Sequence, residues 1–153
     1  MAVAKKALFH GAALIAIVED PTFTALNKAS DAYGHYKVNE TAKLWIKYAN
    51  TPSRQQAGDV YQFSFSPDDL QAIKADRVRG GRILIPLVCG DELICCLTRE
   101  ELLSRIPDPI KQTSVRVLKL AQPRTQPRVL IEGAPELIVP TSRYPDIVFS
   151  KMS

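Results

Sequence analysis

The first strong pattern of apolar residues is helical and covers positions 5 to 18. Apolar side chains recur there at spacings of four and three residues, at Leu8, Ala12, Ile15 and Val18. This spacing is typical of one face of an α-helix. Pro21 follows Asp20, and the residue before a proline is pushed out of the helical region. The pattern therefore predicts a helix over 5–18 with a buried face.

Alternation typical of strands begins near position 33 and continues to position 49. Its centre, Asn39-Glu40-Thr41, consists of turn formers, so we predict a β-hairpin. Within its second half, "AKLWIKY", one parity holds Leu44, Ile46 and Tyr48, and the other holds Lys43, Trp45 and Lys47. Alternate side chains of a strand point to opposite faces, so the hairpin should present a Lys-Trp-Lys face.

The polar stretch "NTPSRQQAGD" predicts a mobile surface loop, and "VYQFSF" then resumes strand alternation. A second helix is predicted to begin at Ser66. A serine cap, a proline at the first helical position and two following carboxylates all favour a helix N-terminus. We expect inward-facing side chains at Leu70, Ile73 and Val78, and a helix end at Gly80-Gly81.

The run "RILIPLVC" is almost continuously apolar, as in a central strand covered on both faces. Pro86 has no N–H for a strand ladder, which predicts an edge or a bulge at that point. Gly90-Asp91 should turn the chain into "ELICCL" as a second hairpin. Thr98 and Glu101 form a capping box, which predicts a short helix ending near Ile106.

A third hairpin is predicted from "TSVRVLKLA" and "QPRVLIEG", and the last twenty residues should hold one or two short strands. The elements together predict an α+β fold with a mixed or mainly antiparallel sheet, two longer helices and one short helix. A chain of 153 residues is typical of one domain. We expect a core over about 5–132 and a proline-containing C-terminal extension over 133–153.

Composition and charge narrow the classes of function. The chain is 46% hydrophobic and 24% charged, which is typical of folded proteins and not of disordered ones. The longest apolar run is too short for a membrane span and lacks a cleavage site after it, so we predict a cytoplasmic protein without membrane contact. Three cysteines in an apolar segment are expected to be reduced core thiols. The net charge of +4 comes from residues 111–153, and such a basic bias suits a polyanionic partner.

The order of helix, strand meander, helix and strand resembles the core of restriction-endonuclease-like nucleases. Such enzymes hold a metal on the carboxylate of a (D/E)-x-K strand motif, and its lysine assists the attacking water. No Asp or Glu in this chain has a lysine two residues later. Glu40 and Lys43, spaced by three, would point to opposite faces of a strand. Glu19 and Asp59 remain candidate ligands only for a rearranged metal site.

Other catalytic motifs are not found, so we predict no catalytic residue, no metal and no cofactor. Phosphate-binding glycine loops precede a helix, whereas Gly80-Gly81 precedes a strand. His10 is expected to pack or to be capped within the first helix, and His35 to lie on a strand surface.

Nucleic-acid binding fits the sequence better than catalysis. Lys43, Trp45 and Lys47 would form a cationic platform on which bases stack, beside Tyr33 or His35 and Lys37 of the paired strand. Further phosphate contacts are predicted from Arg54, Arg77, Arg79, Arg82, Arg116, Arg124 and Arg128. The alternative is that Trp45 packs under a helix while the lysine stems extend around it.

The segments "LWIKYAN", "YQFSFSPDDL" and "LVCGDELICCL" resemble a group of small bacterial domains. In that group an "IKYS" strand precedes a Pro-Trp-x-Phe-x-Phe strand and an "LVCGDDG" hairpin. This chain departs from the pattern at Val60-Tyr61 and at Asp91-Glu92. The resemblance implies a small bacterial or phage cytoplasmic protein and no particular activity.

The sequence therefore predicts a non-catalytic module that associates with DNA or RNA, as an accessory subunit of a larger bacterial or phage assembly. Two alternatives stay open. The first is a protein-interaction or structural subunit that docks a protein partner without touching nucleic acid. The second is a restriction-endonuclease-like nuclease with a rearranged metal site.

Overall fold

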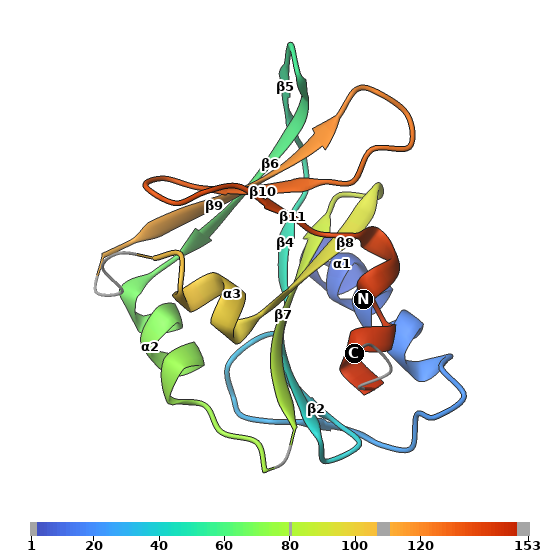
Figure 1. Cartoon of the computed structure of the whole chain (residues 1–153). Coiled ribbons are helices and arrows are strands. Elements are labelled where there is room, and N and C mark those ends of the chain that lie inside the picture. The colour runs from blue at the N-terminus through green and yellow to red at the C-terminus, as the bar shows by residue number, and fades with distance from the viewer. Residues whose placement is uncertain (1–2, 80, 107–110, 150–153) are drawn as a thin grey trace.

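The computed structural model describes residues 3–79, 81–106 and 111–149, and it confirms the α+β class (Figure 1). The helices are α1 (Lys5–Val18), α2 (Pro67–Ala75) and α3 (Arg99–Leu103), followed by two 3-10 turns, η1 (Thr141–Arg143) and η2 (Asp146–Phe149). The first sheet contains β1 (Leu26–Lys28), β2 (His35–Val38), β3 (Ala42–Trp45), β4 (Lys47–Ala49), β7 (Arg82–Cys89) and β8 (Leu93–Thr98). The second contains β5 (Ser53–Gln55), β6 (Gly58–Phe65), β9 (Thr113–Leu120), β10 (Arg128–Ile131) and β11 (Leu137–Ile138).

The first sheet is mixed. Strands β1, β2 and β3 form an antiparallel meander, and the predicted turn over 39–41 joins β2 to β3. Strand β7 runs parallel to β3 and β4 and antiparallel to β8. In Figure 1, α1 and the 3-10 turns lie on one side of β7, and α2 and α3 lie on the other. The predicted helix over 5–18, the hairpin turn and the central strand are therefore confirmed. The predicted buried face of the helix is wrong, because Leu8, Ala12, Ile15 and Val18 are exposed. The helix turns His10, Ala13 and Ile17 toward the sheet instead.

Strand β7 is buried on both faces and separates two apolar clusters. Ile85, Leu87 and Cys89 pack with residues of α2, α3 and the second sheet, whereas Leu84 and Val88 pack with residues of α1 and η2. The neighbouring cysteines Cys95 and Cys96 also point to opposite clusters, and all three cysteines are buried free thiols. The last stretch adds Tyr144, Ile147 and Val148 to the second cluster.

Pro86 lies inside this central strand and not at an edge. The parallel ladder pairs Leu44 with Leu84 in β3 and Lys47 with Leu87 in β4, and it is interrupted between them. At the interruption the backbone N–H of Ile46 donates to Gly34 O at 2.9 Å. The missing N–H of proline is thus accommodated by a break in the neighbouring strand, and "AKLWIKY" forms two strands where the sequence predicted one.

Helix α2 begins as predicted and ends earlier than predicted. Ser66 Oγ accepts the N–H of Asp69, and Asp69 Oδ2 accepts the N–H of Ser66, which completes a capping box. The helix ends at Ala75 because Asp76 adopts an extended conformation and turns its carboxylate toward the first sheet. Val78 therefore lies outside the helix, half-buried, and the expected end at Gly80-Gly81 is wrong.

Gly81 stands where the chain enters β7, next to the β2–β3 turn. A Cβ atom at Gly81 would lie 1.5 Å from the carbonyl oxygen of Thr41, so only glycine fits there. The next residue, Arg82, donates its N–H to the same oxygen at 2.9 Å. This contact fixes the start of β7 against the hairpin that carries Lys43 and Trp45.

The second sheet corrects one prediction and confirms another. The stretch predicted as a mobile loop contains β5, which pairs with the start of β6 as a tight hairpin. Strands β9 and β10 pair as predicted, and β6 pairs with β9 over its whole length. Tyr61, Phe63 and Phe65 of β6 point into the core. In the described part of the chain, no helix combines the length and apolarity needed to cross a membrane.

Candidate functional site

The two lysines of the Lys-Trp-Lys face are paired with carboxylates of α2. Lys43 Nζ lies 2.8 Å from Asp76 Oδ1, and Lys47 Nζ lies 2.8 Å from Asp69 Oδ2. Asp69 belongs to the first turn of α2, and Asp76 is the residue at its C-terminal cap. Helix α2 therefore supplies a counterion to each lysine, and the face predicted as a cationic platform carries neutralised charges.

Asp76 is the centre of a hydrogen-bond network that joins α2 to β2 and β3. Its Oδ2 accepts from His35 Nε2 at 2.7 Å and from Trp45 Nε1 at 2.9 Å. Its Oδ1 accepts from Lys43 Nζ at 2.8 Å and from the N–H of Arg77 at 2.9 Å. Burial alone would raise the pKa of Asp76, but the donors, Lys43 first, outweigh it and hold the pKa below the ordinary value. The carboxylate is thus ionised and fully hydrogen-bonded.

His35 is buried at 5% exposure, which corrects the expectation of a surface residue. Its ring stacks on Trp45 with centroids 3.7 Å apart, because the two residues are directly paired across the hairpin. Desolvation lowers the pKa of His35, although the hydrogen bond to Asp76 opposes the shift. Asp76 only accepts, so Nε2 carries the proton and Nδ1, 2.7 Å from Ser30 Oγ, accepts the hydroxyl hydrogen.

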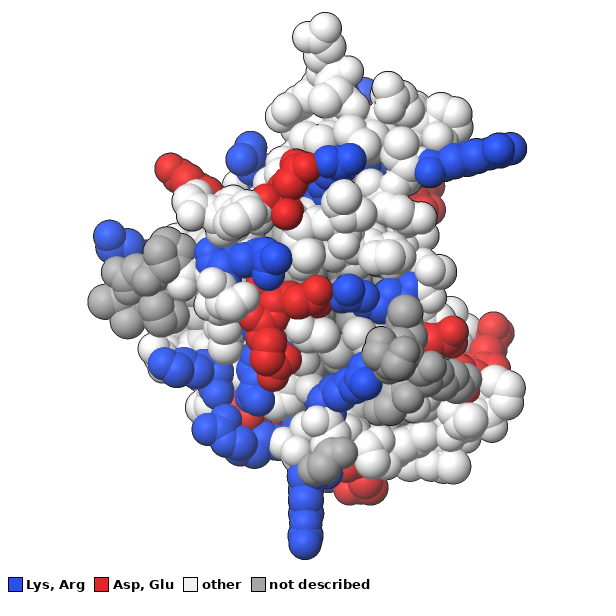
Figure 2. Space-filling model, in the orientation of Figure 1, with Lys and Arg blue, Asp and Glu red and all other residues white. Residues whose placement is uncertain are grey.

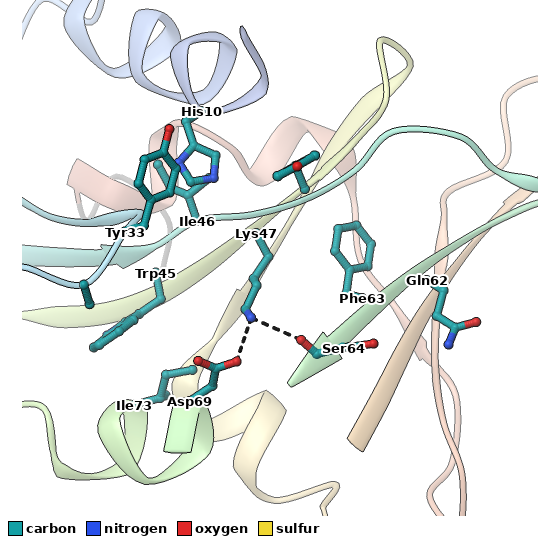
Figure 3. A pocket seen from close by; sticks show the side chains of 12 residues that line it. His10, Tyr33, Trp45, Ile46, Lys47, Gln62, Phe63, Ser64, Asp69 and Ile73 are labelled. Carbon is teal, nitrogen blue, oxygen red and sulfur yellow. Dashed lines mark hydrogen bonds and ion pairs between the residues drawn. The ribbon is translucent and has the colours of Figure 1, made fainter. Parts of the chain in front are cut away.

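A cavity of about 550 Å³ lies beside this network and is shown in Figure 3. Its walls come from α1, the 32–33 turn, β3, β4, β6 and α2, and they are lined mainly by the rings of His10, Tyr33, Trp45, Tyr48 and Phe63. Lys47 reaches into it toward α2, and its Nζ also donates to Ser64 O at 3.1 Å. A concave, largely aromatic cavity with a few polar groups is typical of a ligand site.

His10 forms one end of this cavity. It is 5% exposed, and its ring lies 4.6 Å from that of Tyr33 and 5.9 Å from that of Tyr48. Its Nδ1 is shielded from solvent and makes no hydrogen bond with any described residue. Burial, and then the charge of Lys6, lower the pKa of His10. The expectation of a packed histidine is confirmed, and the ring is neutral near pH 7.

The nuclease resemblance implies a carboxylate two residues before a strand lysine. Two residues before Lys47 stands Trp45, and the carboxylate nearest to Lys47 is Asp69 of α2. Of the two candidate metal ligands, Glu19 is exposed at the end of α1, and Asp59 is paired with Arg54. Within the described ranges, no three His, Cys, Asp or Glu side chains are grouped as a metal would need.

Basic side chains gather instead where α2 leads into β7. We call Lys74, Arg77, Arg79 and Arg82 the basic loop. Lys74, Arg77 and Arg79 are exposed and form no ion pair with any residue that the structure describes. In Figure 2, Lys and Arg side chains gather at the lower left, over the end of α2 and the segment after it. The basic loop adjoins the Asp76 network through Arg77.

The other basic residues predicted to bind nucleic acid belong to the second sheet. Arg54 pairs with Asp59, and Arg128 pairs with Glu136. Arg116 is exposed on β9, and Arg124 is exposed in the turn before β10, where its φ is 63°. The structure therefore places Arg77 beside Asp76, the partner of Lys43, and pairs Arg82 with Ala42, but it leaves this second group on a different sheet.

Sequence reasoning missed Asp69, Asp76 and Ser30 as members of the site. The three-residue turn over 39–41 was sufficient to pair His35 with Trp45, because it sets the hairpin register. No local signal indicates that Asp76 meets this pair, since the contact depends on how α2 lies on the sheet. Comparison with known proteins gives no match to any family model, curated protein or solved structure.

Proposed function

We propose that this protein binds nucleic acid without cleaving it, and that the basic loop makes the phosphate contacts. The observation that carries the proposal is the difference between the two sets of basic residues. Lys43 and Lys47 are paired with α2, whereas Lys74, Arg77 and Arg79 are exposed and unpaired among the described residues. Exposed Lys and Arg side chains are the usual phosphate contacts of nucleic-acid-binding proteins.

The shape of the loop supports this use. Arg77 Nη1 donates to Lys74 O at 2.9 Å and to Asp76 O at 2.8 Å, which orders its side chain at the end of α2. Asp76 itself is held by His35, Trp45 and Lys43. The loop is thus anchored to the sheet at one end by Asp76 and at the other by the contact between Gly81 and Thr41. An anchored cation loses less conformational entropy on binding a phosphate.

We propose that the protein does not cleave nucleic acid, because a tryptophan stands where the nuclease motif has its carboxylate. Trp45, two residues before Lys47, presents an indole that stacks on His35 and donates to Asp76. Lys47 is engaged by Asp69 and by Ser64 O. A lysine held in this way by two acceptors is not free to assist an attacking water.

The test compares two double variants that each remove two positive charges. Lys74→Ala with Arg79→Ala changes the basic loop, and Arg116→Ala with Arg124→Ala changes exposed residues of the second sheet. The side chains of Lys74 and Arg79 form no hydrogen bond or ion pair with described residues, and alanine keeps the Lys74 carbonyl that Arg77 contacts, so the first variant should fold normally. Gel shifts with single-stranded DNA, double-stranded DNA and RNA should show a loss of about tenfold or more for the loop variant at low salt, since two phosphate contacts are removed.

The second-sheet variant should retain most of the affinity. If the second-sheet variant loses as much affinity as the loop variant, the basic loop is not the binding surface. If the natural protein shifts none of the three nucleic acids at micromolar concentration, the proposed function is wrong. Incubating the bound complex with Mg²⁺ or Mn²⁺ should leave the nucleic acid intact, and cleavage that Lys47→Ala abolishes would contradict the proposal.

A further inference from the structure

We infer that the aromatic cavity beside Lys47 receives one unstacked nucleobase, with the attached phosphate held outside it near Lys6. This inference rests on the proposed function, because it names the part of the nucleic acid that enters the protein. It concerns residues of α1, β3, β4 and α2 that the basic loop does not include.

The walls of the cavity suit a flat aromatic ring. Tyr33, Trp45, Tyr48 and Phe63 contribute rings, and the cavity of about 550 Å³ lies within the range of small-molecule sites. In Figure 3, the rings of His10 and Tyr33 lie side by side at one end, whereas the indole of Trp45 extends away from Lys47 and Phe63. Stacking on aromatic side chains is how proteins hold single-stranded bases without strong sequence preference, because every base has a π-face.

The electrostatics of the cavity favour an uncharged guest. The charge of Lys47 is balanced by Asp69 at 2.8 Å, and burial keeps His10 neutral near pH 7 by lowering its pKa. An anion would therefore find no unpaired cation among the described residues that line the cavity. A nucleobase is neutral and planar, whereas its phosphate is charged and would stay in solvent.

Hydrogen-bonding groups remain available to the edge of a base. Lys47 Nζ has three N–H donors, of which Asp69 and Ser64 O use two. Asp69 uses only Oδ2 for its bonds to Lys47 and to the N–H of Ser66. His10 lines the cavity with a buried Nδ1 that has no partner among the described residues. A buried polar atom without a partner is rare and calls for an explanation such as a ligand.

We place the phosphate attached to the bound base near Lys6 of α1. Its Nζ lies 4.5 Å from the centre of the Tyr33 ring, and Tyr33 is 57% exposed at the cavity wall. Lys6 is itself exposed and forms no ion pair with the described residues. A base stacked against Tyr33 would therefore place its sugar phosphate within reach of an available cation.

Nuclear magnetic resonance provides a direct readout, because the chain has one tryptophan and hence one indole N–H signal. The full-length protein is titrated with adenosine, guanosine, cytidine and uridine, which carry no phosphate, and with ribose 5-phosphate, which carries no base. Saturable shifts of the Trp45 indole signal are expected with one or more nucleosides and not with ribose 5-phosphate. No saturable shift with any nucleoside at millimolar concentration would overturn the inference, as would an equal shift with ribose 5-phosphate.

Variants separate stacking from the phosphate contact. Tyr33→Ala should weaken nucleoside binding at least about fivefold, the lower end of base–aromatic stacking effects, whereas Tyr33→Phe keeps the ring and the affinity. Lys6→Ala should weaken the binding of nucleoside monophosphates and leave the affinity for nucleosides unchanged. Equal affinity of Tyr33→Ala and Tyr33→Phe for nucleosides would show that the base does not enter this cavity.

The outcome also distinguishes this inference from the proposed function. The Lys74→Ala, Arg79→Ala variant should bind nucleosides as the natural protein does, because neither residue lines the cavity. If oligonucleotides bind through the basic loop but no nucleoside shifts Trp45, the cavity inference fails and the proposed function stands. If nucleosides bind but the loop variant retains full oligonucleotide affinity, the cavity inference stands and the role of the loop fails.

Discussion

Replacing Asp76 with alanine should destabilise the protein more than the loss of any other carboxylate in the described part of the chain. The side chain of Asp76 is 8% exposed and accepts four hydrogen bonds from two strands and its own helix end. Its removal leaves Lys43, which is 19% exposed, without a counterion. It also leaves two N–H groups without their acceptor, that of the buried His35 and that of the half-buried Trp45.

The expected cost is about 3 kcal/mol. Breaking a buried ion pair from one side costs roughly 3–5 kcal/mol, a range that includes the penalty for the groups left unpaired. We take the lower end because the Lys43 stem is long enough for its ammonium to reach water. With a urea m-value of about 2 kcal/mol/M, the unfolding midpoint should fall by about 1.5 M.

The matched control is Asp59→Ala, which removes a partner of Arg54. The Arg54 side chain is 80% exposed, so this pair should contribute under about 1 kcal/mol. Unfolding is followed by far-ultraviolet circular dichroism, because the fluorescence of Trp45 would change with its contact to Asp76. If Asp76→Ala costs no more than Asp59→Ala, the network does not hold α2 on the sheet, and the anchoring of the basic loop must be explained otherwise.

Three other predictions concern the fold. Burial lowers the folded-state pKa of His10 and His35 below 6.5, so the unfolded chain binds more protons around that pH. Urea unfolding should therefore show lower stability at about pH 5.5 than at about pH 7.5, and a flat profile would contradict neutral buried histidines. Gly81→Ala should prevent stable folding through its clash with Thr41 O, whereas Gly11→Ala, with no atom within 4 Å of the new Cβ, should stabilise α1 by about 0.5–1 kcal/mol. Thermal melts measure the stability of both glycine variants against the natural protein. Burial raises the pKa of all three thiols, so a thiol reagent should label the folded protein only after urea is added, and rapid labelling without urea would contradict the buried positions.

The sequence predicted well those elements whose determining residues lie close together along the chain. The apolar spacing predicts the bounds of α1 but the wrong buried face, since Leu8, Ile15 and Val18 are exposed. The start of α2 follows from Ser66 and the carboxylate three residues later. The capping box of Thr98 likewise begins α3 as expected. In each case the interacting groups lie within one or two helical turns of each other, so that the amino-acid order alone contains the information.

The site depends on contacts that are distant in sequence. Lys43 and Asp76 meet because α2 lies on the side of the sheet that carries Trp45, and no periodicity of either segment indicates that packing. The same packing determines whether Trp45 is exposed as a stacking platform or covered by α2. The residue is half-buried between His35 and the core that contains α2, and its lysine neighbours are paired with α2. The basic surface is therefore found after α2 and not on the strand.

The most direct test of the proposed function is the salt dependence of oligonucleotide binding. Affinity for a labelled single-stranded oligonucleotide is measured at several salt concentrations for the natural protein and for the Lys74→Ala, Arg79→Ala variant. The logarithm of affinity should fall linearly with the logarithm of salt concentration, and the variant's slope should be shallower by about 1.4, since each lost phosphate contact accounts for roughly 0.7 on a single strand. An identical slope in both proteins, or binding that does not change with salt, would contradict phosphate recognition by the basic loop.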